Sequence, residues 1–317
     1  MGTTEQTTGT ETPSAPAIAP FTDLDLLEAE ALHLLHAVMS ECERPALLFS
    51  GGKDSAVVLH LVSKAAWPGE PQVPALHVDT EHNFPEVIAY RDAALARYHV
   101  ELLVASVSEA IEAGLVVEDA SPGASRNALQ SAVLLDAVAR YGFDALVGGA
   151  RRDEEKARAK ERMLSVRDSS GGWNPRHQRP ELWDLHNPLH GPGEHLRCFP
   201  LSNWTEMDVW RYVEREGIEL PSIYFAHRRP VVRRAGMLVG VGPHTPPAPG
   251  EEVLEATVRY RTVGDMTCTA AIESAASSIP EVMAEIASTR TSERGATRMD
   301  DRGSRWSMED RKKAGYF

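Results

Sequence analysis

The chain has 317 residues, enough for one large or two modest domains with a substantial buried core. Its 46 acidic residues outnumber its 33 basic ones, giving a formal net charge of −13. Most of such a surface repels phosphate backbones, so we expect no nucleic-acid partner. Nor do we expect a membrane partner, because no apolar run approaches the roughly 20 residues that a spanning helix needs.

The N-terminal residues and the cysteines indicate where the protein works. Residues 1–20 are rich in Thr, Pro and Ala and lack the basic start and apolar stretch of a secretory signal, so we expect a disordered tail. Cys42, Cys198 and Cys268 lie far apart without a C-x-x-C pair, which argues against disulfides, a zinc site and an iron–sulfur cluster. We therefore expect a cytoplasmic protein with reduced thiols.

The first half of the chain alternates between two apolar patterns. Short apolar runs predict buried strands, and apolar residues at helical spacing predict helices. In chain order, the expected elements are a helix over 23–41, a strand over 45–49, a helix over 54–66, a strand over 73–80, a helix opened by Pro85 and running to about 98, a strand over 100–106, a helix over 126–142 that stops at Gly142, and a strand over 144–149. This alternation predicts an α/β fold with a doubly wound, mainly parallel sheet and flanking helices.

The second half is less regular. The stretch 167–194, rich in Gly, Pro, His and Trp, predicts an ordered functional loop or a mobile lid. A helix is expected over 202–217, with Thr205 as its N-cap and Gly217 at its end. After it come a Pro-Gly linker at 240–253, a helical segment over about 267–287 and a charged tail from Thr291.

A six-residue stretch, SGGKDS at 50–55, joins the first strand to the following helix. Gly51 and Gly52 allow a tight turn whose N–H groups face an anion, and the helix adds its positive end. Lys53 supplies a full positive charge, Asp54 either caps the helix or helps to hold Mg²⁺, and hydroxyl donors come from Ser50 and Ser55. The pattern predicts a phosphate-binding loop that is not of the Walker type. The alternative is a plain turn with a surface lysine.

This stretch resembles the PP-loop, the pyrophosphate-binding loop of the adenine nucleotide α-hydrolase-like superfamily. Further blocks are similar to the small, catalytic subunits of heterodimeric sulfate adenylyltransferases, and the likeness runs from about residue 21 to the last residue. Examples are LHVDTEHNFPEVIAYRD at 76–92, FPLSNWTEMDVWRYVEREG at 199–217 and SMEDRKKAGYF at 307–317.

The resemblance implies a reaction, a metal and a partner. ATP and sulfate would form adenylyl sulfate and pyrophosphate, the first step of sulfate activation, with Mg²⁺ accompanying ATP. The loop would hold the departing β and γ phosphates. The partner would be a GTPase large subunit, subunit 1, whose GTP hydrolysis drives formation of the unfavourable phosphosulfate anhydride.

The densest basic cluster of this acidic chain follows the strand at 144–149. Two anions must meet in the implied reaction, and a guanidinium suits a tetrahedral oxyanion. We expect Arg151 and Arg152 to bind sulfate or the α phosphate and to act in catalysis with Lys53. Further sulfate ligands are expected at Lys156, Arg158 and Arg179. The alternative for this cluster is a solvated helix face, which we favour for Lys160 and Arg162.

Two more residues lie where the strands end and nucleotides gather. Gly149 is expected beside the ATP. Asp79 either binds a ribose hydroxyl, joins the Mg²⁺ ligands or caps its own turn.

We divide the chain into the tail at 1–20, a PP-loop ATP-binding catalytic domain at 21–235 and a partner-binding extension at 236–317. Three other hypotheses compete with the main one. A tRNA-modifying PP-loop enzyme is disfavoured by the absence of paired cysteines and by the net charge of −13. A phosphoadenylyl sulfate reductase shares the fold, but such reductases lack this lysine pattern and carry a catalytic cysteine near the C-terminus, whereas the last cysteine here is Cys268. An ATP-binding regulatory or scaffold subunit of a GTPase complex stays open.

Overall fold

A computed structural model describes residues 21–119, 125–154, 156–181, 185–289, 293 and 297. The side chains of residues 156 and 157 are outside this description. The expected tail at 1–20 and almost all of the charged tail from Thr291 also lie outside the described residues.

The larger sheet has six strands in the order β3-β2-β1-β4-β6-β5, and all neighbours run parallel except β5, which is antiparallel to β6. This order confirms the predicted doubly wound, mainly parallel sheet. The four strands expected from the apolar runs are all present, whereas β5 and β6 were not foreseen. The strands are β1 (Pro45–Leu48), β2 (Ala75–Asp79), β3 (Leu102–Ser106), β4 (Ala145–Val147), β5 (Leu164–Arg167) and β6 (His195–Cys198).

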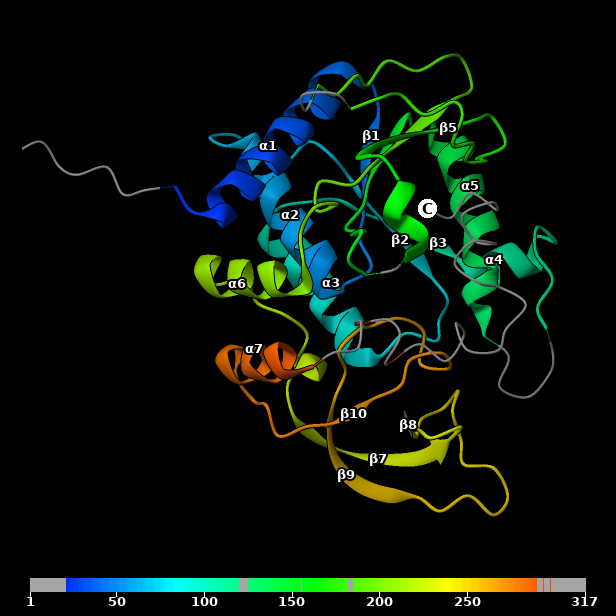
Figure 1. Ribbon diagram of the computed structural model, residues 1–317. Coiled ribbons are helices and arrows are strands. Elements are labelled where there is room, and N and C mark those ends of the chain that lie inside the picture. Colours follow the sequence, from blue (N-terminus) through cyan, green and yellow to red (C-terminus); the bar gives the residue numbers. More distant parts are fainter. Residues whose placement is uncertain are drawn as a thin grey trace, which may run out of the picture.

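Helices cover both faces of this sheet (Figure 1). One apolar core joins the sheet to α1 (Asp23–Glu41), α2 (Lys53–Ala66), α3 (Pro85–Arg97) and α6 (Glu206–Glu216). A second core joins the opposite face to α4 (Val107–Glu112) and α5 (Gln130–Tyr141), which follows the short 3-10 helix η1 (Arg126–Ala128). Two buried faces explain why the strands are apolar runs without alternation.

Helix ends follow local signals in the sequence. Pro85 occupies the first turn of α3, as expected. The Thr205 side chain accepts a hydrogen bond from the Asp208 N–H, and the Asp208 carboxylate accepts one from the Thr205 N–H, which makes a capping box. Gly142 and Gly217 end α5 and α6 in the left-handed conformation, with φ of 66° and 64°.

A smaller antiparallel sheet lies below the first one in Figure 1, in the order β10-β9-β7-β8. The domain boundary placed at residue 235 falls in the turn between β7 and β8. The helix expected over 267–287 is correct only from Ile279, because the preceding segment forms a turn and then pairs with β9. The elements are β7 (His227–Arg234), β8 (Met237–Gly240), β9 (Leu254–Arg259), β10 (Ile272–Glu273) and α7 (Ile279–Ser288), with 3-10 helices η2 (Lys156–Lys160) and η4 (Ser222–Tyr224) earlier in the chain.

Among the helices of the described ranges, none combines the length and the apolar character needed to cross a bilayer.

Candidate active site

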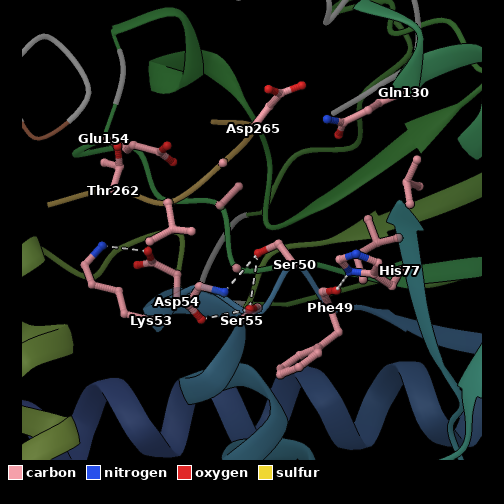
Figure 2. Close-up of a pocket in the computed structure, with 18 of the residues that line it drawn as sticks. Phe49, Ser50, Lys53, Asp54, Ser55, His77, Gln130, Glu154, Thr262 and Asp265 are labelled. Atoms are coloured by element: carbon pink, nitrogen blue, oxygen red, sulfur yellow. Dashed lines mark hydrogen bonds and ion pairs between the residues drawn. The ribbon is translucent and has the colours of Figure 1, made fainter. Parts of the chain in front are cut away.

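A pocket of about 250 Å³ opens beyond the carboxyl ends of β1, β2 and β4, where ligands gather in open parallel sheets. Figure 2 shows Ser50, Lys53, Asp54 and Ser55 along one side of it and Asp265 and Gln130 on the other. Its apolar side is built by Leu48, Leu76, Val78 and Leu134, and its remaining polar lining includes Asn127, Glu154, Arg158, Arg197, Tyr224, Thr262 and Glu293.

Two glycines let the backbone of the 50–55 loop pack closely against its neighbours. Gly51 has a φ of +75°, and a Cβ there would lie 2.7 Å from Val87 Cγ1. A Cβ on Gly149 would lie 2.9 Å from the backbone carbonyl carbon of Asp54. A side chain at either position would collide with these neighbours, so contact requires glycine at both, and the positive φ adds a conformational requirement at Gly51 alone.

Lys53 is buried beside the pocket, with 1 % of its side chain exposed. Its Nζ donates to Asp54 Oδ2 at 2.7 Å and also to Glu293, and its backbone N–H donates to Tyr224 Oη at 2.9 Å. Burial disfavours the ammonium, but the carboxylates of Asp54 and Glu293 outweigh it and raise the lysine pKa above its usual value. Lys53 is therefore a fixed positive charge.

Asp54 links Lys53 to Arg151, whose Nε donates to Asp54 Oδ1 at 2.6 Å. Burial opposes ionisation of Asp54, but the Arg151 guanidinium and the Lys53 ammonium hold its pKa at about 2. Gly52 is the N-cap of α2, and the Asp54 carboxylate bonds to Lys53 Nζ and Arg151 Nε rather than to N–H groups of the first turn. These contacts do not match the capping alternative for Asp54, whereas an ionised carboxylate at the pocket edge suits Mg²⁺ held through ATP phosphates.

Glu293 reaches the same site from the C-terminal part of the chain. It is 4 % exposed, and its two carboxylate oxygens accept hydrogen bonds from Lys53 Nζ and from the Arg151 guanidinium. Burial raises its pKa to about 7, although both cations act in the opposite direction. Two cations thus face the carboxylates of Asp54 and Glu293, and Asp153 lies 3.5 Å from the Arg151 guanidinium as a third.

The neighbours Arg151 and Arg152 point in different directions. Arg151 has 1 % of its side chain exposed and binds Asp54 and Glu293. Arg152 turns away from the pocket: its Nε and one terminal nitrogen donate to the Glu161 carbonyl, at 3.2 and 3.0 Å, and the other nitrogen donates to Asn203. The structure therefore brings only the first of the two expected arginines to the site.

Comparison with known proteins shows the family. A family model described as the phosphoadenosine phosphosulfate reductase domain matches residues 44–271. A Streptomyces lavendulae protein named sulfate adenylyltransferase subunit 2 is 58 % identical over 294 residues, which cover 93 % of this chain and 92 % of the relative. This chain belongs to the sulfate adenylyltransferase subunit 2 family. A Mycobacterium tuberculosis H37Rv member of that name is also 58 % identical and covers 96 % of this chain and 97 % of its own.

Among solved structures, the FMN adenylyltransferase of Candida glabrata in complex with ATP matches 66 % of this chain and 62 % of its own, with a TM-score of 0.44 and 14 % identity.

The three further residues expected to bind sulfate differ in whether they reach the pocket. Arg158 lines the pocket and binds Glu161 at 3.3 Å. Arg179 donates instead to the Asn187 carbonyl at 2.8 Å, in an exposed stretch. The side chain of Lys156 is outside the described part of the chain.

Asp79 closes its own turn rather than facing the pocket. Its Oδ1 accepts from the Glu81 N–H at 2.7 Å and from Asn83 Nδ2 at 3.0 Å. Of the three roles considered for Asp79, the described contacts match the turn cap.

Several pocket residues of this family member were not foreseen from the sequence. Asn127 and Gln130 stand at the start of α5, where Gln130 Nε2 donates to Asn127 Oδ1 at 2.8 Å. Asp265 is 1 % exposed and accepts from the Thr267 N–H at 2.8 Å. Arg197 is fully buried on β6. Of these residues, only Asn127 and Gln130 had a local signal in the sequence, because polar residues near the start of a helix can contact a ligand at the edge of the sheet.

Within the described ranges, no three His, Cys, Asp or Glu side chains are grouped so that they could hold a metal ion.

Proposed function

We propose that this chain catalyses adenylyl transfer from ATP to sulfate, giving adenylyl sulfate and pyrophosphate. The observation that carries the proposal is the buried Lys53 within the SGGKDS loop, in a chain 58 % identical over 93 % of its length to a protein named sulfate adenylyltransferase subunit 2. A loop of this kind, with a lysine fixed in its charged form, supports binding of an anionic leaving group.

The chemistry needs no covalent intermediate. A sulfate oxygen attacks the α phosphorus, the bond from that phosphorus to the oxygen bridging the α and β phosphates breaks, and pyrophosphate leaves with the bonding electrons. Charge then builds on the pyrophosphate, where Lys53 and Arg151 stabilise it. The proposed sulfate ligands are Arg151 and Arg158; Arg158 is 3 % exposed and lines the same pocket.

Adenosine is proposed to lie against the apolar side of the pocket. Leu48, Leu76 and Val78 form one side of that slot, and Leu134 of α5 faces them. Such a slot suits a flat base, and Gln130 at its edge offers polar contacts. Mg²⁺ bound with the phosphates and held through Asp54 would neutralise part of their charge.

A second subunit is part of the proposal. The relatives are named as subunit 2, which supports a complex with a first subunit. We propose that this partner is a GTPase, that it binds the extension at 236–317, and that the complex works in the cytoplasm.

The deciding experiment measures adenylyl sulfate and pyrophosphate formed from ATP and sulfate, by the chain alone and with the GTPase subunit plus GTP. We expect sulfate-dependent product that rises with GTP. Tight ATP binding without product under either condition would instead favour a regulatory or scaffold subunit.

Reduction of an adenylyl sulfate is disfavoured by the state of the cysteines. Cys42, Cys198 and Cys268 are all buried. Burial raises the pKa of the Cys42 thiol to about 12 and that of Cys198 well above its usual value, whereas nucleophilic attack needs a thiolate.

A further inference from the structure

The carboxylate of Glu293 lies where an incoming phosphate needs to bind. Both of its oxygens are engaged, one by Lys53 Nζ and the other by Arg151. These are the two cations that we propose to stabilise the leaving pyrophosphate. Glu293 also lines the pocket together with Ser50, Gly52 and Ser55.

Glu293 is anchored to the wall opposite the loop. Thr297 Oγ1 donates to the Glu293 carbonyl at 3.0 Å, and it lies 2.7 Å from Thr262 Oγ1. The Ala270 N–H donates to the Thr297 carbonyl at 2.8 Å. The described residues of this segment therefore have defined contacts with the 262–270 stretch, part of which lines the pocket.

The charges of Lys53, Arg151, Asp54 and Glu293 determine what a phosphate group must displace in order to bind here. Lys53 and Arg151 are already balanced by Asp54 and Glu293, so the network has no excess positive charge to offer a polyphosphate. A phosphate group bound to the same two cations would lie within a few ångströms of Glu293, in a buried setting where like charges repel strongly. A phosphate that accepts the N–H groups now bonded to Glu293 must displace that carboxylate.

We propose that Glu293 is an internal competitor of ATP, whose carboxylate occupies the cationic phosphate site until the nucleotide displaces it. The inference rests on the proposed function in one respect, namely that nucleotide phosphates bind Lys53 and Arg151. It adds a regulatory contact between the C-terminal segment and the catalytic loop. Conditions that neutralise or remove this carboxylate increase the affinity for ATP.

The pH dependence follows from the surroundings of Glu293. With a pKa of about 7, the carboxylate is charged at pH 8 and largely protonated at pH 6, so competition weakens as the pH falls. The charged and titratable groups facing it are Lys53 and Asp54 of α2, Arg151 of the loop after β4, Glu206 of α6, Tyr224 of η4 and Arg261 of the stretch after β9.

The test measures Kd values by calorimetry for ATP, for its α,β-methylene analogue and for AMP, using the full chain at pH 8 and pH 6. We expect Glu293→Gln to bind ATP and the analogue about tenfold more tightly at pH 8, a difference of about 1.4 kcal/mol, and about twofold more tightly at pH 6. AMP, which lacks the β and γ phosphates, should change less than twofold. The matched control is Glu252→Gln, which removes the same charge from an exposed position.

Unchanged or weaker ATP binding by Glu293→Gln at pH 8 would overturn the inference, and weaker binding would identify Glu293 as a residue that positions the two cations. Glu293→Asp, which keeps the charge on a shorter side chain, should stay closer to the wild type than the glutamine variant does. Adenylyl sulfate formation is measured in parallel. If Glu293→Gln binds ATP more tightly but no sulfate-dependent product forms, Glu293 competes with ATP and the proposed reaction is rejected. If product forms but ATP binding is unchanged, the proposed reaction stands and the competition is rejected.

Discussion

The two walls of the pocket differ in charge and in origin. The wall at the edge of the parallel sheet is cationic: Lys53, in the loop after β1, lines the pocket, and Arg151, in the loop after β4, bonds to Asp54 behind it. The opposite wall is acidic, with Asp265 and Glu293 contributed by segments more than a hundred residues further along the chain. The difference teaches that the strand–loop–helix pattern supplies the groups that we propose bind phosphate, whereas the carboxylates that balance their charge depend on the fold of the whole chain.

Removing the lysine of the cationic wall should have the largest effect. Lys53→Ala is expected to lower adenylyl transfer about 100- to 1000-fold, the usual loss when one preorganised electrostatic contact to a leaving group is deleted. Initial rates of adenylyl sulfate formation by the full complex check this. Pull-down with the partner should be unchanged. Lys160→Ala, at an exposed position, is the matched control, and activity retained in Lys53→Ala would reject the assignment.

The two adjacent arginines provide the next test. Arg151→Met should reduce the rate about 100-fold, because its guanidinium belongs to the cationic network. Arg152→Met should stay within about threefold of the wild type, since that side chain faces Asn203 and the Glu161 carbonyl. If both variants lost the same activity at equal thermal stability, Arg152 would contribute to the reaction as much as Arg151 does, against the described contacts.

A pair of glycines tests the packing of the cationic wall. Gly149→Ala should destabilise the protein by about 1–3 kcal/mol, because its Cβ would lie 2.9 Å from the Asp54 carbonyl carbon. Gly148→Ala is the control, since the nearest atom to its Cβ is 3.7 Å away, an ordinary contact. Urea denaturation of both variants measures the difference. Similar urea midpoints for the two variants would mean that the loops at 50–55 and 148–150 can move apart without a loss of stability.

The smallest expected effect concerns the acidic wall. Thr262→Val removes the hydroxyl that meets Thr297 at 2.7 Å and so loosens the segment that carries Glu293. ATP binding should tighten about two- to threefold, since one neutral hydrogen bond contributes about 0.5–1.5 kcal/mol. Calorimetry with Thr257→Val, at an exposed position on β9, supplies the baseline. Looser ATP binding would indicate that the anchor helps to shape the pocket.

Features that depend on local sequence could be predicted, whereas features that depend on contacts between distant segments could not. Alternating apolar patterns were enough to predict the parallel strands β1 to β4, and Thr205 and Gly217 marked the ends of α6, because such signals act within a few residues. The SGGKDS loop pointed to Lys53 for the same reason. The second sheet was missed, since its register depends on pairing between segments far apart in the chain.

Side-chain direction was the harder problem. Arg151 and Arg152 stand side by side after one Gly-Gly turn, and only the contact of Arg152 with Asn203 and the Glu161 carbonyl decides that it faces away. Glu293 bonds to a lysine 240 positions earlier, which no local pattern can indicate. The helix expected over 267–287 failed at its start because the Asp265 carbonyl and carboxylate hold a turn through Thr267 and Thr269.

Tyr224 connects the two halves of this molecule mechanically. Its hydroxyl accepts a hydrogen bond from the backbone N–H of Lys53 at 2.9 Å, and Tyr224 lies in η4, three positions before β7 begins the smaller sheet. A rotation of that sheet against the larger one must stretch this hydrogen bond or carry the first turn of α2 along with it. The Tyr224 phenol is therefore one direct contact through which a movement of the smaller sheet reaches the loop that carries Lys53.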